Sequence, residues 1–357
     1  MTILLAVLLL LFFVPCSFSV RGFHLDRYIG RDEIQPIKGL FLVLVFASHF
    51  CQYVPLGGGL DAGYLSTRKF LGQMIVVPFL FYSGYGIVAS IRRKGEAYLL
   101  SMPTQRILKV FFQFAVAVMI YVVVQRYRMG KVFPASHVWL SILGWKSVGN
   151  SNWYIFAIVL LYVLTFLSFW AFNHPRYPHA PLIALTLLTI VLMAILSTAR
   201  PTYCYNTLMA YVAGAWFYGW KRHFDEIFLS NHRAWAVGLV GFALAFCLLQ
   251  PHWKSTLVCS GASFAFAFAI VLISAKVISR NAVLSYCGRH LFSLYILQRL
   301  PMVVLQPTDF AKAHKYGYLL VCLAATFVIS AAFDFVIPMI WAQLTRLFQK
   351  IPFRTHV

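Results

Sequence analysis

Long apolar runs recur along the chain and are separated by short polar segments. A helix needs about 20 mainly apolar residues to cross a bilayer. The pattern therefore predicts an all-α polytopic membrane protein that crosses the membrane ten or eleven times. The predicted helices lie near residues 2–20, 36–54, 70–91, 105–125, 152–173, 180–198, 205–220, 233–250, 256–275, 284–305 and 316–346.

Composition supports this fold class, because 61% of the 357 residues are hydrophobic and only 11% are charged. Soluble globular domains carry about 25% charged residues, and a soluble fold of this length cannot hide so much apolar surface. The seven cysteines form no C-x-x-C motif and mostly lie within apolar runs. We therefore interpret them as small buried hydrophobic residues rather than metal ligands.

The basic residues predict an orientation in the membrane. Lys and Arg total 30 against nine Asp and Glu, but they occur in short groups between the apolar runs. This layout is typical of membrane loops rather than of a nucleic-acid-binding surface, so no nucleic-acid partner is expected. If residues 21–35 are cytoplasmic, successive loops alternate between the two sides of the membrane. Eighteen cations then lie on the cytoplasmic side, Arg354 among them, and ten on the outer side, while Lys38 and Arg299 fall within spans.

The first apolar run resembles a retained helix more than a cleaved signal. No Lys or Arg precedes residues 2–20, whereas Arg21, Arg27 and Arg31 follow them, which is the wrong charge order for a secretory signal. A misassigned start codon is the alternative. We therefore expect residues 1–33 to form an amino-terminal transmembrane helix with a cytoplasmic linker, and residues 34–357 to form one transmembrane domain.

One predicted helix carries two ionisable residues, whose insertion into the hydrocarbon of the membrane costs free energy. Lys38 and His49 are eleven residues apart, which returns a helix to nearly the same azimuth about 16 Å further along. The lysine can extend to the cytoplasmic boundary, and a histidine deeper in the protein can act as a general base on a hydroxyl. Alternatively, His49 is a packed histidine that hydrogen-bonds to a neighbouring helix.

Two further ionisable residues lie in apolar runs. For Asp334 a structural ion pair with Lys38, Arg106 or Arg289 is favoured over catalysis. Arg299 either extends to the outer boundary or contacts a substrate.

Two loop regions offer binding groups, each with a simpler explanation. Arg92, Arg93, Lys94, Arg106 and Lys109 concentrate five cations in eighteen residues. They either keep the loop on the cytoplasmic side or clamp the phosphates of a nucleotide-like cofactor. The first role is enough to explain the cluster of charge.

An interfacial aromatic belt explains Trp153 and Tyr154; alternatively, these aromatic residues and the amide of Asn152 bind a sugar. Ser83 and Gly84 form a small-residue patch that permits close helix packing.

No P-loop, H-E-x-x-H, G-x-S-x-G or carboxylate pair is present, which argues against an ATP-driven pump, a zinc protease and a serine hydrolase. No metal is expected.

In order along the chain, these features resemble the acyltransferase-3 family of membrane O-acyltransferases. Lys38 and His49 are similar to the family's basic residue and histidine with ten residues between them. Phe79-Leu-Phe-Tyr-Ser83-Gly84-Tyr85 resembles F-F-x-x-S-G-F, Arg106-Ile-Leu-Lys109 resembles R-x-x-R, and Trp153-Tyr154 resembles the family's W-F/Y. Residues 291–298 are similar to S-Y-x-x-Y-L-x-H, although Gln298 stands in place of the histidine. Lys109 likewise replaces an arginine and loses its bidentate geometry.

The resemblance implies a ten-helix core plus an extra amino-terminal helix, and transfer of an acyl group, usually acetyl, from cytosolic acetyl-CoA to a carbohydrate hydroxyl. His49 would be the general base, and Lys38 would either hold the donor or support the histidine electrostatically. An acyl-histidine intermediate is a less favoured variant. Arg92, Arg93, Arg106 and Lys109 would hold the donor, and Ser83, Asn152 and Trp153 the acceptor. The expected setting is the bacterial plasma membrane, with surface polysaccharide or glycolipid as acceptor, membrane lipid around the protein, and homo-oligomerisation left open.

Two other functions are compatible with the sequence. A transporter, flippase or polymerase of lipid-linked glycans also needs many helices and basic cavities, but no inverted repeat or broken helix pair is evident. A non-catalytic membrane scaffold, in which His49 is only packed, is the second.

Overall fold

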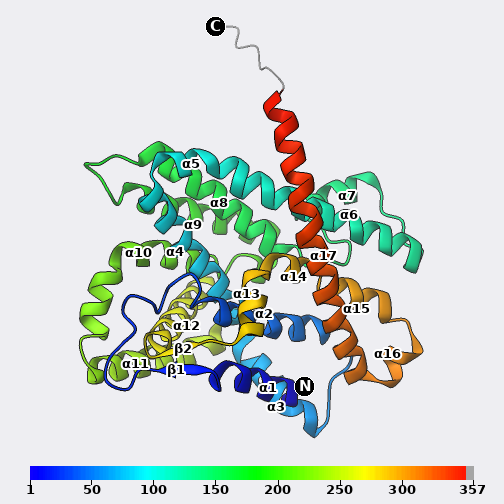
Figure 1. Cartoon of the computed structure of the whole chain (residues 1–357), viewed down its shortest axis with the longest axis horizontal. Helices are drawn as coiled ribbons and strands as arrows, with labels where there is room; N and C mark the ends of the chain where they lie inside the picture. Colours follow the sequence, from blue (N-terminus) through cyan, green and yellow to red (C-terminus); the bar gives the residue numbers. More distant parts are fainter. Residues whose placement is uncertain (351–357) are drawn as a thin grey trace. The chain divides into compact units, whose positions relative to one another are not determined.

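The computed structural model describes residues 1–350, and Arg354 lies outside them. The chain forms two compact units, which are treated separately below. The first unit comprises Met1–Ile107 and Trp153–Leu291, and the second comprises Leu108–Asn152 together with the chain from Phe292 onward. Most of the described residues are helical and two three-residue strands, Cys16–Phe18 and Val277–Ser279, form the β structure among them, which confirms the predicted all-α class (Figure 1).

The first unit contains most of the helices and one short antiparallel ribbon. Its elements are α1 (Thr2–Phe13), β1 (Cys16–Phe18), α2 (Gln35–Phe50), α3 (Gly59–Leu71), α4 (Val77–Lys94), α5 (Glu96–Met102), α8 (Trp153–Phe172), α9 (Ala180–Ala199), α10 (Met209–Phe228), α11 (His232–Leu249), α12 (Thr256–Lys276), β2 (Val277–Ser279) and α13 (Ala282–Arg289). Short 3₁₀ turns occupy Gly72–Val76, Thr202–Cys204 and Gln250–His252, and a π-helical turn spans Pro103–Leu108.

The second unit contains α6 (Lys109–Met129), α7 (Ala135–Ile142), α14 (Leu291–Leu297), α15 (Arg299–Leu305), α16 (Asp309–Ala313) and α17 (Lys315–Lys350). Within this unit, the Tyr121 hydroxyl on α6 donates to the Ile296 carbonyl oxygen on α14 at 3.1 Å. Gln125 donates to the Val148 carbonyl oxygen at 3.2 Å. These bonds hold α6 to α14 and to the loop that follows α7.

Seven helical segments among the described residues are long and apolar enough to cross a membrane. They are Gly59–Lys94, Glu96–Met129, Trp153–Phe172, Ala180–Ala199, His232–His252, Thr256–Lys276 and Lys315–Arg346. Thr2–Phe13, Gln35–Phe50 and Leu291–Leu305 are shorter apolar helical segments. The structure thus confirms a polytopic membrane protein.

Two predicted spans have different boundaries in the structure. The run at 2–20 is helical only over Thr2–Phe13, about 18 Å at 1.5 Å per residue, because Cys16–Phe18 pair with Val277–Ser279 as a ribbon. The run at 284–305 is divided among α13, α14 and α15 rather than forming one helix. The chain breaks near His290 and Gln298, where polar residues interrupt the apolar sequence.

Glycines let two helix pairs in the first unit approach at backbone distance. A Cβ added at Gly84 on α4 would overlap the Tyr211 carbonyl oxygen on α10, and one added at Gly214 would overlap the Phe81 carbonyl oxygen. The pair α2 and α13 has the same arrangement, with Gly39 against Leu284 and Gly288 against Gln35. Small residues at such crossings allow van der Waals packing without a hydrophobic drive between helices.

The segment between β1 and α2 is fixed to the end of α10. The Tyr28 hydroxyl donates to Asp225 at 2.6 Å, and Lys221 donates to the second Asp225 oxygen at 2.7 Å and to the Leu25 carbonyl oxygen at 3.1 Å. Burial and the Asp225 carboxylate raise the pKa of Tyr28, so the hydroxyl stays protonated and donates at neutral pH.

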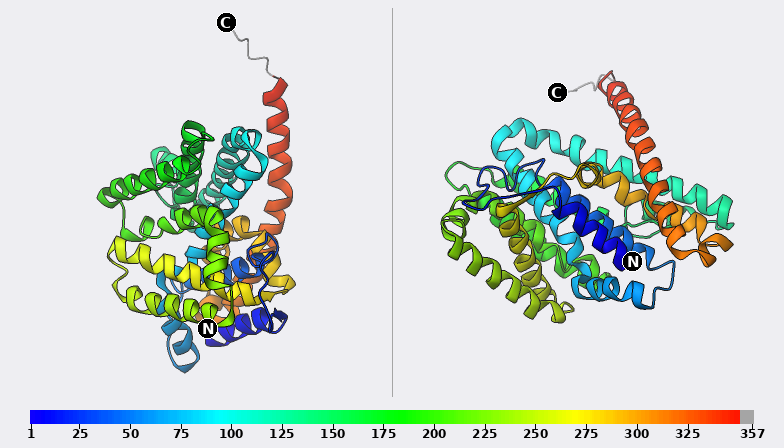
Figure 2. Two further views of the ribbon diagram at one scale, coloured as in Figure 1. Left: turned by 90° about the vertical axis from the view of Figure 1, so that its left-hand side faces the viewer. Right: turned by 60° about the horizontal axis from the view of Figure 1, so that its bottom comes forward.

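Both views of Figure 2 show α11 and α12 running side by side in the same unit.

Candidate active site

The helix α2 carries Lys38 and His49 on the face that retains accessible surface. Pro36 stands in the first turn, where a missing N–H costs nothing, and the helix continues unbroken to Phe50. Twelve of its sixteen residues are buried, whereas Lys38, Leu40, Ser48 and His49 are half-buried. The structure therefore confirms the shared helix, on which the two side chains lie about 16 Å apart in rise.

A cation also lies beside the His49 end of α2. The Arg68 guanidinium on α3 donates from Nε to the Ser48 hydroxyl at 3.2 Å. The sequence analysis assigned no role to Arg68. Its contact with the residue next to His49 puts a fixed positive charge near the predicted base.

Cations also gather around Tyr98 on α5. The Arg106 Nε donates to the Tyr98 hydroxyl at 3.2 Å, and the Lys94 ammonium lies 5.5 Å from the centroid of the Tyr98 ring. Both side chains are solvent-exposed. Tyr98 is thus a common partner of two cations from either side of the α4–α5 turn, a role that the sequence analysis missed.

Lys38 belongs to the same electropositive region. The charges of Arg31 and Arg106 both act on Lys38. Among the residues that the structure describes, no acidic side chain forms an ion pair with Lys38, Lys94 or Arg106. Uncompensated cations of this kind attract an anionic ligand such as a phosphate group.

Arg92 and Arg93 donate hydrogen bonds to groups other than Tyr98. The Arg92 guanidinium donates to the Pro178 carbonyl oxygen in the turn before α9 and lies 5.5 Å from the centroid of the Phe169 ring. Arg93 donates from Nε to the Ala89 carbonyl oxygen of its own helix at 3.3 Å. Arg92 therefore fixes the α8–α9 connection, and a role in donor binding stays a prediction for both arginines.

A row of polar side chains lies between α4, α8 and α10. The Ser83 hydroxyl is 2.9 Å from the Tyr162 hydroxyl, and the Tyr211 hydroxyl is 2.8 Å from the Thr165 hydroxyl. The rings of Tyr162 and Tyr211 are 6.4 Å apart, and the charge of Arg106 acts on both. The row therefore lies within electrostatic range of Arg106, one of the cations near Tyr98.

The Gly84 crossing sets α4 against α10, and the preceding residue, Ser83, reaches Tyr162 on α8. Trp153, at the start of α8, meets Tyr203 edge to face with centroids 6.3 Å apart. Tyr154 meets Phe79 similarly at 6.1 Å. Tyr203 is 45% exposed, so part of this aromatic pair is accessible.

Lys109 and Asn152 belong to the second unit. Lys109 opens α6 and is half-buried. Asn152 uses its amide hydrogens to donate to the carbonyl oxygens of Gly144 at 2.9 Å and Lys146 at 2.8 Å. These bonds hold the turn before α8 in shape, so Asn152 has a structural function, and its predicted role in substrate binding is not tested.

The second unit also contains Asp334. The Ser293 hydroxyl on α14 donates to the Asp334 carboxylate on α17 at 2.7 Å. Gln298 is buried and donates to the Tyr295 carbonyl oxygen at 2.9 Å, while its Oε1 has no partner among residues 1–350. The Ser293–Asp334 pair fixes α14, which carries the last motif of the family resemblance, to α17.

No group of three His, Cys, Asp or Glu side chains that could hold a metal ion occurs among the described residues. Thiols at Cys204, Cys259, Cys287 and Cys322 are buried. The functional groups that the structure offers are therefore a histidine, hydroxyls and uncompensated cations.

Comparison with known proteins identifies the family. The model of the acyltransferase-3 family, described as an acyltransferase domain, matches residues 31–335, which is most of the chain. No curated protein and no solved structure shows a significant match. The resemblance stated from the sequence motifs is confirmed, and the matched range contains both Lys38 and His49. Together with the membrane-spanning helices, the match shows that the chain belongs to the acyltransferase-3 family and is a membrane acyltransferase.

Proposed function

We propose that the protein transfers an acetyl group from cytosolic acetyl-CoA to a carbohydrate hydroxyl at the outer face of a bacterial plasma membrane. The observation that carries this proposal is the arrangement on α2. His49 lies about 16 Å along the helix from Lys38, which belongs to a group of uncompensated cations. One helix thus joins an anion-attracting end to a candidate base.

The donor would bind with its phosphates near Tyr98. Arg106, Lys94 and Lys38 supply positive charge there without an acidic partner. Arginine and lysine next to phosphate oxygens form charge-assisted hydrogen bonds, which are roughly twice as strong as neutral ones. For Lys109, which belongs to the second unit, phosphate binding stays a prediction from the resemblance. The Ser83–Tyr162 row is proposed as polar lining for the thioester arm.

The chemical step would use His49 as general base. Its imidazole takes the proton of the acceptor hydroxyl while that oxygen attacks the thioester carbonyl carbon. The carbon–sulfur bond then breaks, the ester forms, and the coenzyme A thiolate leaves and recovers a proton from the imidazolium. General-base catalysis of this kind contributes typically about 10²–10⁴-fold to rate. Attack by His49 itself, with an acyl-histidine intermediate, is the less favoured variant.

The acceptor side is proposed at Trp153, where the edge-to-face contact with Tyr203 presents aromatic surface to an external ligand. Aromatic rings that are apolar on one side and hydrated on the other are suited to a membrane–water interface. A sugar that stacks there would place its hydroxyls on the same side as the His49 end of α2, according to the predicted orientation.

A purified preparation in proteoliposomes tests the proposal against glycan transport. We expect acetyl-CoA on the Lys38 side to release coenzyme A only when a carbohydrate acceptor is present, with one acetyl ester formed per thiol. Replacing Lys38 with alanine should raise the KM for acetyl-CoA. Movement of glycan across the bilayer without thioester consumption would favour a flippase and contradict the proposal.

A further inference from the structure

A buried lysine of the first unit joins the segment after β1 to the ends of α11 and α12. Lys276 is the last residue of α12 and is only 3% exposed. Its ammonium donates to the Ser19 carbonyl oxygen at 3.1 Å and lies 2.8 Å from Nδ1 of His232, the first residue of α11. One charged group therefore contacts three separate parts of the unit.

Aromatic rings surround the same ammonium. Its nitrogen lies 4.5 Å from the ring centroid of Phe23, 5.7 Å from that of Trp235 and 6.0 Å from that of Phe18. The face of an aromatic ring attracts a cation within about 6 Å of the centroid. Phe18 ends β1 and Phe23 follows it, and the Phe23 ring also lies 5.5 Å from the imidazole of His232. The ammonium thus holds this segment by its rings as well as by a carbonyl oxygen.

Backbone hydrogen bonds continue the attachment of this segment. The Ser19 N–H donates to the Lys276 carbonyl oxygen and the His24 N–H donates to the Ala275 carbonyl oxygen, both at 2.9 Å. Residues 16–18 pair with β2, which follows α12 directly. Residues 16–24, called the strap below, are therefore fastened along the carboxyl end of α12, and the chain continues from the strap to α2.

The contact between Lys276 and His232 requires that one of the two groups lacks a proton. An ammonium has donors and no acceptor, and a protonated imidazole also has donors only. Whichever group donates across the 2.8 Å contact, the receiving nitrogen must be unprotonated. His232 is solvent-exposed, so protons from water can reach it. Full protonation of the pair breaks this bond and places two positive charges side by side.

The charges on the surrounding elements do not offset a second proton on the pair. These groups are Cys16, Arg21, His24, Asp26 and Tyr28 before α2, Lys221, Arg222, His223, Asp225 and Glu226 at the end of α10, Arg233 on α11, and Arg280 after β2. Both acids of α10 are already paired with cations of their own helix. Asp26 is solvent-exposed and forms no ion pair within the described part of the chain. His232 also begins α11, where the partial positive charge of a helix amino terminus disfavours a cation.

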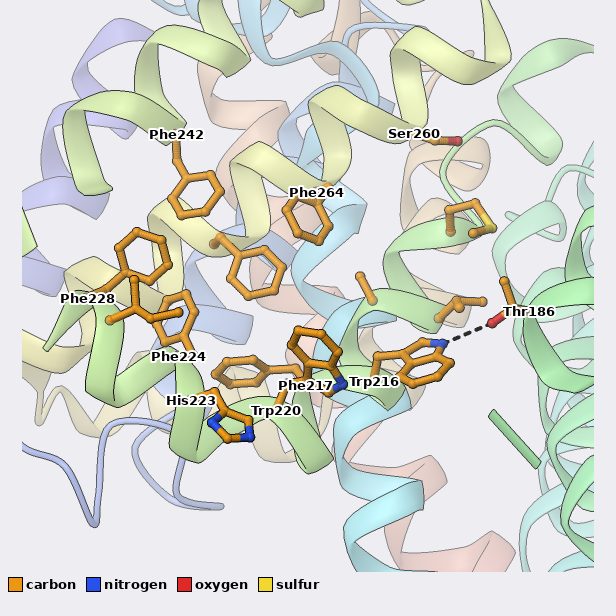
Figure 3. Close-up of a pocket in the computed structure, with 15 residues that line it drawn as sticks. Thr186, Trp216, Phe217, Trp220, His223, Phe224, Phe228, Phe242, Ser260 and Phe264 are labelled. Carbon is orange, nitrogen blue, oxygen red and sulfur yellow. Dashed lines mark hydrogen bonds between the residues drawn. The ribbon is translucent and has the colours of Figure 1, made fainter. Parts of the chain in front are cut away.

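Packing between α10, α11 and α12 keeps the two charged groups together. Rings from all three helices line an apolar groove along α10, and Figure 3 shows Phe228 of α10, Phe242 of α11 and Phe264 of α12 around it. The centroid of Phe242 lies 5.6 Å from that of Phe228 and 6.2 Å from that of Phe264. Close to the charged pair, the Trp235 indole on α11 donates to the Leu272 carbonyl oxygen on α12 at 2.8 Å. Repulsion within the pair therefore acts on the strap rather than on the spacing of the helices.

We propose that His232 and Lys276 form a pH-sensitive latch that holds the strap at neutral pH and releases it in acid. While the pair carries one proton too few to repel, the ammonium stays among its rings and binds the Ser19 carbonyl oxygen. When both groups are protonated, the ammonium moves away from the imidazole and the strap loses these contacts. The bond between Tyr28 and Asp225 is a second attachment of the chain before α2. The latch makes the first attachment depend on pH.

Hydrogen–deuterium exchange of the full chain in nanodiscs tests the latch. The amides of Ser19 and His24 report on it, because both donate to the end of α12 when the strap is bound. Exchange is corrected for the direct effect of pH and compared at about pH 8 and about pH 5.5, on either side of the ordinary titration of an imidazole. We expect protection of these amides to fall about tenfold or more in acid, the factor implied by loss of one hydrogen bond to a charged group. Amides within α12 should keep their protection.

Three substitutions identify the responsible groups. His232→Asn places an oxygen near the position of Nδ1 that can accept from Lys276 at every pH, and Lys276→Met fills the aromatic site without a charge. We expect neither variant to lose protection of the strap in acid. His24→Asn is the matched control, since it removes the other histidine beside the end of α12. It should respond to pH like the unsubstituted protein.

Equal protection of the strap at both pH values in the unsubstituted protein would overturn the latch. An acid response of full size in His232→Asn or in Lys276→Met would also overturn it, and loss of the response in His24→Asn would assign the effect to that histidine instead. None of these measurements needs acetyl-CoA, so the latch is tested separately from the proposed reaction.

Discussion

The helix crossing at Gly84 provides a sharp test of how packing positions the candidate site. In Gly84→Ala, the new Cβ would overlap the Tyr211 carbonyl oxygen and lie 2.9 Å from its carbonyl carbon and 3.1 Å from the Ala215 nitrogen, where ordinary contact begins at 3.4 Å. The obstructing atoms are backbone, so the helices α4 and α10 themselves must separate. The carbonyl carbon alone requires a movement of at least about 0.5 Å.

The size of the effect follows from two opposing contributions. Overpacking costs typically about 1–3 kcal/mol, while alanine gains about 1 kcal/mol over glycine in helix propensity. We expect a net loss of up to about 2 kcal/mol in the free energy of unfolding. Because Ser83 moves with the helix and contacts Tyr162, acetyl transfer should fall further, by up to about 10²-fold for a displacement near 1 Å.

Gly86→Ala is the matched control, since a Cβ there meets nothing within 4 Å. It has the same chemistry on the same helix and should be neutral or stabilising by up to about 1 kcal/mol. Unfolding midpoints in detergent and rates of acetyl transfer would be measured for both variants. If Gly84→Ala matched Gly86→Ala in both measurements, the close crossing would not be needed to position Ser83.

Three further predictions concern single polar contacts. Tyr98→Phe removes the hydroxyl that accepts a hydrogen bond from Arg106. In steady-state kinetics it should raise the KM for acetyl-CoA severalfold and leave kcat unchanged. An altered kcat at constant KM would show that Tyr98 does not act through donor binding. Tyr28→Phe breaks the bond to Asp225 and should cost about 1.5–3 kcal/mol, because the acceptor is charged; an unchanged unfolding midpoint would contradict this. Asn152→Ala removes two hydrogen-bond donors from the turn before α8 and should lower the free energy of unfolding by about 1–3 kcal/mol. The KM for the acceptor should change only if Asn152 also contacts the substrate.

Local periodicity explains what the sequence could predict. The placement of Lys38 and His49 on one face needs only an unbroken helix, and α2 provides it from Gln35 to Phe50. The small-residue crossing at Gly84 was also expected as a packing site, although the sequence did not identify α10 as its partner. Tyr98 follows Lys94 by four residues but lies on α5 beyond the break at Gly95, so helical periodicity does not predict their contact.

Contacts between distant segments explain what could not be predicted. Ser83 and Tyr162 are 79 residues apart, so no local pattern signals their hydrogen bond. The first helix ends early because Cys16–Phe18 pair with a strand some 260 residues later. The contact of Arg68 with Ser48 depends on how α3 returns towards α2, which no local pattern signals.

Transfer of labelled acetyl groups to carbohydrate measures the central claim most directly. Purified protein in liposomes would receive acetyl-CoA labelled in the acetyl group together with a polysaccharide acceptor, and the label in the carbohydrate would be counted. The account predicts that His49→Ala retains its fold and its binding of acetyl-CoA but loses transfer by about 10²–10⁴-fold. Transfer by His49→Ala at the rate of the unsubstituted protein would contradict it.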